Sequence, residues 1–302
     1  MVKKWAYFIL VVAFGFVMTA CNEEQVQIEE GNGGFLWKAV NGDTEVYLQG
    51  TIHLGTENFY PLNKQSEEAY EQADVVLPEI DLTDLNNMTL SSQLMMEKAM
   101  YPEGQSLQDD LSSENYEKLE SILSGFGVDM VMVENFQPWF MEMTLLQLAL
   151  EESSYQAEQG VDLYFLERAV EDGKQIQELE SIEEQLDVLS GFSMEQQLVT
   201  LTDAIEGFDD MEDELEQMAN AWLAGDVDAL AEIDEDYDES YEEYMLELNE
   251  NRNIKMANEI AEILEADSGQ NYFVIVGAMH FASEPTIISL LEEQGYEVEF
   301  VY

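Results

Sequence analysis

The chain has 302 residues, of which 66 are acidic and 10 are basic, and its formal net charge is −56. So few cations cannot form a basic stripe that neutralises phosphates, which excludes nucleic acid as a partner and, on the same ground, direct adhesion to an anionic lipid surface. Hydrophobic residues make up 46% of the sequence, which indicates a folded core. We therefore expect most of the carboxylates on a solvated face rather than in a cation-binding surface.

The first residues have the pattern of an export signal. Two lysines precede an apolar run over residues 5–17, which is too short for a membrane-spanning helix. Small residues then precede Cys21, the only cysteine in the chain, and this arrangement resembles a bacterial lipobox. We expect a signal peptide over residues 1–20, lipid on Cys21 and an acidic tether over residues 21–34. The lipid would hold the protein at the extracytoplasmic face of the cell membrane, and an uncleaved anchor helix would place the domain on the same side.

The segment after the tether predicts a hairpin that leads into a histidine. Two strand-like runs flank an Asn-Gly turn at residues 41–42, and the second run ends just before His53. A helix over residues 62–72 and a buried strand over residues 74–81 follow. The order strand, helix, strand predicts a right-handed crossover and a parallel pairing of the two strands. Glu79 should then lie at the same edge of the sheet as His53.

Helical spacing of apolar residues dominates an insertion from about residue 82 to residue 265. Its first predicted helix covers residues 91–100. A short strand over residues 174–180 interrupts the helices and ends at Glu180. Near the end of the insertion, Arg252 opens another helix, and we interpret it either as a surface arginine or as a cation held among carboxylates near the sheet edge.

The end of the chain predicts a second strand that leads into a histidine. The apolar run over residues 272–276 precedes a loop with His280, and a helix over residues 284–294 and a strand over residues 296–302 follow. Together these elements predict one α+β or α/β domain over residues 35–302. It should contain a central mixed β-sheet with an N-terminal hairpin, flanked by helices and the large helical insertion.

The two histidines are the only ones in the chain, and both end a Gly-x-x-His sequence that follows a predicted strand. A single histidine in such a place is more often a hydrogen-bonded core residue than a ligand. Because His53 and His280 occur in matching contexts, we favour a shared metal or acid/base site at the carboxyl edge of the sheet.

The order of these motifs resembles the TraB/GumN (PrgY-like) family, which includes the Tiki proteins. The resemblance rests on the hairpin into residues 50–53, the strand over residues 75–81, the segment over residues 174–180, the Arg-Asn pair at residues 252–253 and the final motif at residues 276–280. It covers nearly all of the chain after the tether. Pro78, directly before Glu79, departs from the pattern of the family.

The resemblance implies a metal-dependent protease and assigns roles to five residues. His53 and His280 would be metal ligands, and Glu79 a ligand or general base. Arg252 would stabilise charge on the substrate, and Glu180 would be a further carboxylate of the catalytic site.

Two neutral imidazoles and one carboxylate leave open positions on a divalent ion, which can polarise a carbonyl and acidify a bound water. This ligand set suits Mn, Co, Zn or Fe about equally. The sequence thus favours a lipid-anchored extracytoplasmic metal-dependent hydrolase that cleaves a peptide or protein substrate.

Two other functions stay open at this point. A non-catalytic surface protein could bind or sequester a peptide signal without any metal. A metal-free hydrolase, such as an esterase, could use a histidine as its base, although the chain has no Gly-x-Ser-x-Gly elbow. Metal content and product formation distinguish the three.

Overall fold

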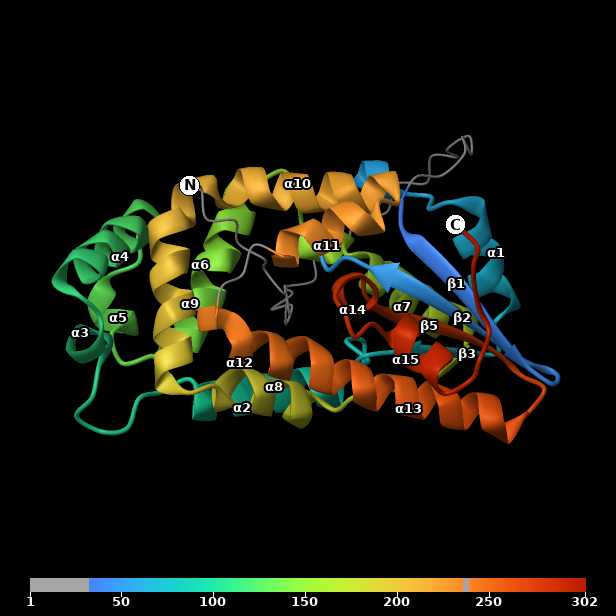
Figure 1. Cartoon of the computed structure of the whole chain (residues 1–302). Helices are drawn as coiled ribbons and strands as arrows, with labels where there is room; N and C mark the ends of the chain where they lie inside the picture. Colours follow the sequence, from blue (N-terminus) through green and yellow to red (C-terminus); the bar gives the residue numbers. More distant parts are fainter. Residues whose placement is uncertain (1–32, 236–238) are drawn as a thin grey trace.

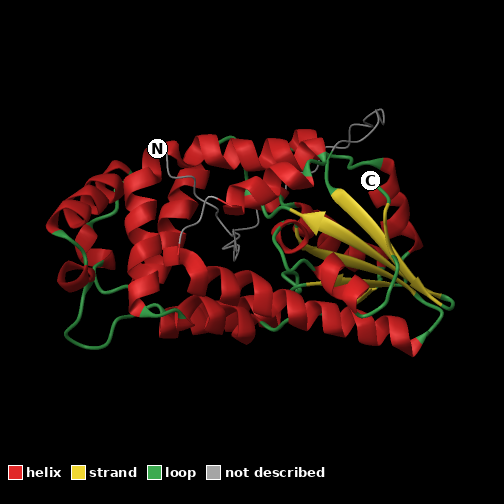
Figure 2. Cartoon of the chain, viewed as in Figure 1, coloured by secondary structure: helices red, strands yellow, loops and turns green. Residues whose placement is uncertain are grey.

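The structure is a computed structural model that describes residues 33–235 and 239–302. The predicted signal peptide, Cys21 and most of the tether lie outside these residues. Within the described part, a six-stranded mixed sheet lies at one end of the molecule and helices extend from it (Figure 2). This arrangement confirms the predicted class of mixed sheet, N-terminal hairpin and large helical insertion.

The sheet has the strand order β4-β3-β5-β2-β1-β6. Strands β2, β5, β3 and β4 run parallel to one another, whereas β1 is antiparallel to both of its neighbours. The strand bounds are β1 Phe35–Asn41, β2 Thr44–Thr51, β3 Val75–Pro78, β4 Gln175–Ile176, β5 Asn271–Gly277 and β6 Val298–Phe300. The hairpin of β1 and β2 turns at Gly42, whose φ of 59° lies in the left-handed region that glycine favours. The predicted Asn-Gly hairpin is therefore confirmed.

One expected strand pairing is wrong in its partner. The helix between β2 and β3 does produce parallel strands, but β3 pairs with β5, and β5 lies between β3 and β2. The reason is the composition of β5. Its residues 272–276 are all buried, and such a strand is stable only with neighbours on both edges and cover on both faces. Strand β5 comes last in the sequence among the four parallel strands, but it lies between two of the others, β3 and β2.

Helices cover the sheet and build the rest of the molecule (Figure 1). Their bounds are α1 Lys64–Gln72, α2 Leu85–Lys98, α3 Leu107–Asp110, α4 Ser113–Gly125, α5 Met130–Val133, α6 Pro138–Glu152, α7 Val161–Asp172, α8 Ile182–Gly191, α9 Met194–Gly207, α10 Met211–Ala224, α11 Val227–Glu235, α12 Glu242–Met245, α13 Asn251–Ala266, α14 Met279–Ala282 and α15 Ile287–Glu293. A π-helical turn over Leu246–Glu250 precedes α13. No helix in the described ranges has both the length and the apolar character that crossing a bilayer requires.

Two helices from the part of the chain between β3 and β5 pack against the sheet. Helix α7 packs against β3 and β5, where Phe165 lies edge-on to Phe273, while α13 packs against β1 and β2. Tyr70 of α1 joins the same aromatic group on β5. These contacts bring the starts of α7 and α13 near the sheet and therefore position polar residues beside its carboxyl edge.

Several elements differ from the predictions in extent or type, and the strands predicted over residues 74–81 and 296–302 cover only Val75–Pro78 and Val298–Phe300. The helix predicted from residue 91 begins at Leu85, because Asp84 accepts a hydrogen bond from the Asn86 N–H and caps it there. The strand predicted over residues 174–180 is only two residues long, and the segment after it follows β3 through single backbone hydrogen bonds. His280 lies on the short helix α14 rather than in a loop.

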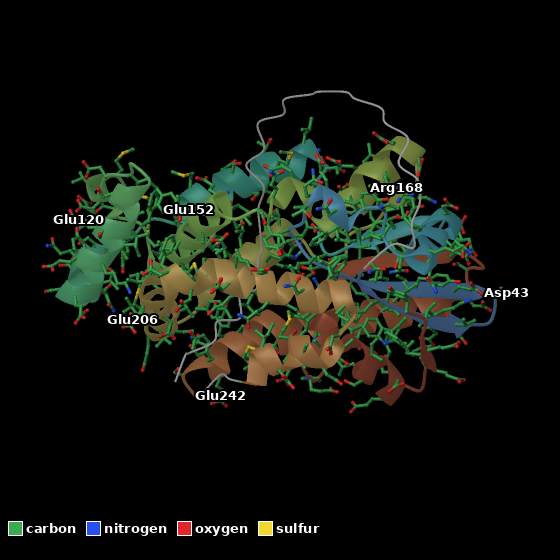
Figure 3. The ribbon with its side chains drawn as sticks, turned by 90° about the horizontal axis from the view of Figure 1, so that it is seen from above. Asp43, Glu120, Glu152, Arg168, Glu206 and Glu242 are labelled. Atoms are coloured by element: carbon green, nitrogen blue, oxygen red, sulfur yellow. The ribbon has the colours of Figure 1, made fainter. Side chains whose placement is uncertain are left out.

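Most acidic residues of the described part lie on the outside of the molecule, whereas Glu79, Asp162, Glu180 and Asp203 are buried. Figure 3 labels exposed acids from distant elements, which spread around the periphery: Asp43, Glu120, Glu152, Glu206 and Glu242. This distribution agrees with the expected solvated face. It keeps the like charges in water, which weakens their mutual repulsion.

Candidate metal site

The carboxyl ends of three parallel strands bring the predicted site residues to one edge. Thr51 at the end of β2 pairs with Gly277 at the end of β5, and Pro78 at the end of β3 pairs with Ile275. His53, Glu79 and His280 each follow one of these ends within three residues. The expectation that they share an edge is therefore confirmed by the strand register.

Gly277 marks the point at which the three side chains converge. A Cβ atom added to Gly277 would lie 3.3 Å from Glu79 Oε1 and 3.7 Å from both His53 Nε2 and His280 Cδ2. The missing side chain thus leaves a space bordered by the two imidazoles and the carboxylate. At Gly50, the glycine of the first motif, a Cβ would instead meet the Phe35 ring at 3.2 Å and the Ala278 backbone at 3.4 Å. The two matching glycines therefore have different roles.

The Glu79 carboxylate is held by hydrogen bonds to both of its oxygens. Oε1 accepts from the Gly277 N–H at 2.7 Å, and Oε2 accepts from Arg252 Nη2 at 2.6 Å and Gln185 Nε2 at 3.1 Å. Burial opposes its charge, but Arg252 and, less strongly, His280 outweigh burial and lower the pKa of Glu79 to about 2. Glu79 is consequently ionised at neutral pH.

Arg252 is a buried cation among carboxylates, as one of our two interpretations proposed. Its Nε donates to Glu180 Oε1 at 3.0 Å, its Nη2 donates to Glu180 Oε2 at 2.6 Å, and its Nη1 donates to the Leu248 carbonyl at 3.2 Å. Burial disfavours the charge, yet Glu79 and Glu180 raise the pKa of Arg252 above its ordinary value. Arg252 therefore fixes the orientation of Glu79, and Glu180 acts on the site through Arg252.

Gln185 is a site residue that sequence reasoning missed. Its Nε2 donates to Glu79 at 3.1 Å and to Glu180 at 2.9 Å, so it joins the two carboxylates from α8. The sequence does contain a signal for it. Gln185 lies among Ile182, Leu186 and Leu189 on the apolar side of that helix, where a polar side chain needs a buried partner.

The outward nitrogen of His53 contacts Asp162, which sequence reasoning also missed. Nδ1 of His53 lies 3.1 Å from Asp162 Oδ1. Burial would lower the pKa of His53, but the charge of Asp162 outweighs burial and raises it to about 9. In the sequence, Asp162 looks like any acid in the first turn of a helix, where the helix dipole favours negative charge, so nothing distinguished it.

His280 is more deeply buried than His53 and has a neutral partner. Its residue is 1% exposed, and its Nδ1 lies 2.5 Å from Asn253 Oδ1. Burial and the positive charge of Arg252 lower the pKa of His280 to about 3. His280 is therefore neutral near pH 7, as a metal ligand must be.

Part of this arrangement has the spacing of metal ligands. Two ligand atoms that each lie about 2.1 Å from one ion are at most about 4.2 Å apart. His280 Nε2 and Glu79 Oε1 are 3.8 Å apart and satisfy this limit. Within residues 33–235 and 239–302, however, no three His, Cys, Asp or Glu side chains are close enough as they stand to hold an ion. The donor types fit a metal, and His53 would have to approach the other two to complete the site.

The family model of the TraB/PrgY/gumN family matches residues 35–300. The chain belongs to this family. The match covers the sheet, the helical insertion and all five predicted site residues, so the resemblance noted in the sequence is confirmed.

Several known proteins are similar in sequence to this TraB/PrgY/gumN protein at low identity. An uncharacterized protein of Treponema pallidum is 24% identical over 85% of this chain and 80% of its own length. Metalloprotease TIKI1 of Danio rerio is 24% identical over 88% of this chain but only 62% of its own length, so this chain spans about three fifths of that relative. YbaP of Escherichia coli is 23% identical over 85% of this chain and 93% of its own length. No solved structure matches the chain.

Proposed function

We propose that this TraB/PrgY/gumN protein is a metal-dependent hydrolase that cleaves peptide or protein substrates. The observation that carries the proposal is the 3.8 Å separation of Glu79 Oε1 and His280 Nε2, with His53 Nε2 beside the same space at Gly277. The similarity to relatives named metalloproteases supports this choice of reaction.

The side chains at this site would have different roles. His53, Glu79 and His280 would hold a divalent ion, which would supply Lewis acidity and lower the pKa of a bound water. We assign Glu79 to binding the ion, because a carboxyl group with a pKa of about 2 is a weak base near neutral pH. Arg252 places a positive charge beside the site, which favours negative charge developing on the substrate, and Glu180 keeps Arg252 in place.

The ion would be Mn, Co, Zn or Fe, because imidazole with carboxylate suits each of them. We further propose that lipid on Cys21 anchors the protein at the extracytoplasmic face of the cell membrane. Its substrates would then be peptides or proteins on that side.

Metal binding and cleavage can be measured on one preparation. The chain would carry an affinity tag without histidine, be stripped with a chelator and be reloaded with each of the four ions. Elemental analysis should find about one ion per chain, and mass spectrometry of a peptide mixture should find cleavage only in reloaded protein. The double variant His53→Ala, His280→Ala should lose both the ion and cleavage.

A matched pair of glutamate variants controls for the loss of charge. Glu79→Gln should lose the ion, whereas Glu183→Gln changes an exposed glutamate on α8 and should keep it. Full cleavage by the double histidine variant would refute the metal mechanism. Stoichiometric peptide binding that survives the chelator, with no product, would favour a protein that sequesters a peptide.

A further inference from the structure

Each imidazole of the site is contacted on its outward side by a residue that lies outside both Gly-x-x-His motifs. Asp162 lies 3.1 Å from His53 Nδ1, and Asn253 lies 2.5 Å from His280 Nδ1. The other nitrogen of each ring, Nε2, borders the space at Gly277 or faces Glu79 Oε1. The two rings therefore present the same atom to the site.

The direction of the hydrogen bond between Asn253 and His280 is fixed by a chain of amides. Asn253 Nδ2 donates to the Pro285 carbonyl at 2.8 Å and to Asn249 Oδ1 at 3.2 Å. Asn249 Nδ2 in turn donates to the Ser283 carbonyl at 3.1 Å. Backbone carbonyls can only accept, so neither amide can be turned over without placing two acceptors against each other. Asn253 must direct its oxygen at His280.

An amide oxygen also only accepts, so the proton of this hydrogen bond belongs to His280 Nδ1. In the neutral ring the lone pair is then on Nε2, which faces Glu79. A ring that binds a metal through Nε2 needs this tautomer, and an outer acceptor on Nδ1–H is the usual means of fixing it.

Asp162 does the same for His53 from another element. A carboxylate oxygen is an acceptor, so a neutral His53 ring, as in a metal complex, would carry its proton on Nδ1 at this 3.1 Å contact. The start of α7 is held against the His53 segment, because the Val161 N–H donates to the Ile52 carbonyl at 2.8 Å. Gly160 is equally close, since a Cβ there would lie 3.0 Å from the carbonyl carbon of His53.

We propose that Asn253 and Asp162 are positioning residues, each of which holds one imidazole with its proton on Nδ1 and directs Nε2 toward Glu79 and Gly277. The consequence for metal affinity rests on the proposed function, whereas the tautomer of His280 does not. Removing such an outer partner lowers metal affinity about 10- to 100-fold.

The tautomer can be observed directly, because the chain has two histidines and selective ¹⁵N labelling gives two rings. In the metal-free full chain, long-range ¹H–¹⁵N spectra at neutral pH should show His280 protonated at Nδ1 alone. Asn253→Ala should lose this preference. Asn258→Ala, the same substitution at an exposed site on α13, should keep it. Protonation of wild-type His280 at Nε2 alone would overturn the proposal without any variant.

Metal binding supplies the second readout. With ¹¹³Cd²⁺ as the probe, both rings should show coupling through Nε2, and coupling through Nδ1 in either ring would overturn the proposal. Competition with a chromophoric chelator should show Zn²⁺ affinity about 10- to 100-fold weaker in Asn253→Ala and Asp162→Ala. Asp162→Asn keeps an acceptor and should lose less, while Glu171→Gln, at an exposed acid of α7, should match the wild type.

These outcomes separate the two proposals. Unchanged Zn²⁺ affinity in both alanine variants would overturn the positioning role. If the wild type shows the expected His280 tautomer but binds neither ion, the positioning of His280 stands and the proposed function fails.

Discussion

At the scale of single residues, the two histidines of matching motifs have opposite acid–base behaviour. His53 faces the carboxylate of Asp162 and has a pKa raised to about 9, whereas buried His280 faces Asn253 and has a pKa lowered to about 3. The difference arises from the partner and the burial of each ring, because both rings lie near the same Arg252 and Glu79. One ring is charged and the other neutral near pH 7 in the metal-free protein.

The ion pair of His53 and Asp162 predicts a pH-dependent contribution to stability. The folded pKa of about 9 lies above the unfolded value near 6.5, so the stabilisation is fully present below about pH 6.5 and is lost as pH rises through about 9. Asp162→Asn should therefore lower the free energy of unfolding by about 2 kcal/mol at pH 6.5 and by much less at pH 10. Urea unfolding at both pH values measures this, with Glu171→Gln as the control. An equal loss at both values would contradict the ion pair.

Buried Arg252 predicts a second residue-scale effect. Arg252→Met would leave Glu79 and Glu180 buried together without their cation, and breaking a buried pair in this way costs about 3–5 kcal/mol. Lys255→Met, three residues along the same helix, removes a more exposed ion pair with Glu184 and should cost no more than about 1 kcal/mol. Urea unfolding of both variants gives the comparison. Similar costs would show that Arg252 is not essential to the buried cluster.

At the scale of elements, the parallel strands decide which residues meet. The sequence indicated three strands with His53, Glu79 and His280 at their ends, and parallel order was enough to place all three at one edge. The sequence did not indicate that β5 lies between β2 and β3, because strand order depends on burial of the whole strand rather than on chain order. The sequence also indicated a loop at His280, because a single turn of helix is too short to show a periodic pattern.

The end of β5 predicts different consequences for the two motif glycines. In Gly277→Ala the methyl group would enter the space between Glu79 and both histidines, so metal affinity should fall at least about fivefold, which is about 1 kcal/mol of binding free energy. Stability should change little. In Gly50→Ala the methyl group would instead press on Phe35 and the Ala278 backbone, so the main effect should be a loss of folding stability. Zn²⁺ competition and thermal unfolding of both variants test this contrast. Equal metal affinity in Gly277→Ala and the wild type would show that the ion does not use this space.

At the scale of the whole molecule, the acidic surface and the N-terminal segment agree with the proposed location at the extracytoplasmic face of the membrane. The exposed acids are spread over many elements, which suits a protein that stays soluble outside the cytoplasm (Figure 3). With a net charge of −56 the chain would be repelled by anionic lipid, so attachment to a membrane requires a separate anchor.

The lipid anchor on Cys21 can be tested in a bacterial host. The full chain expressed with an alkynyl fatty acid should be labelled and should sediment with the membranes. Cys21→Ser should lose the label, because Cys21 is the only thiol in the chain. Retained label in the serine variant would disprove attachment at this residue.

The sequence by itself determined the hairpin, the class of the sheet and the edge that carries His53, Glu79 and His280, because these depend on local patterns and on the direction of parallel strands. Only the tertiary structure decided that Asp162, Asn253 and Gln185 contact these side chains. Each of the three lies on a helix that reaches the edge through packing between distant segments. The sequence pattern marks only Gln185 as a buried polar residue, and it does not indicate which side chain any of the three contacts. The pKa values of the two histidines follow from the same contacts, since charge interactions depend on distance in space and burial rather than on spacing along the chain.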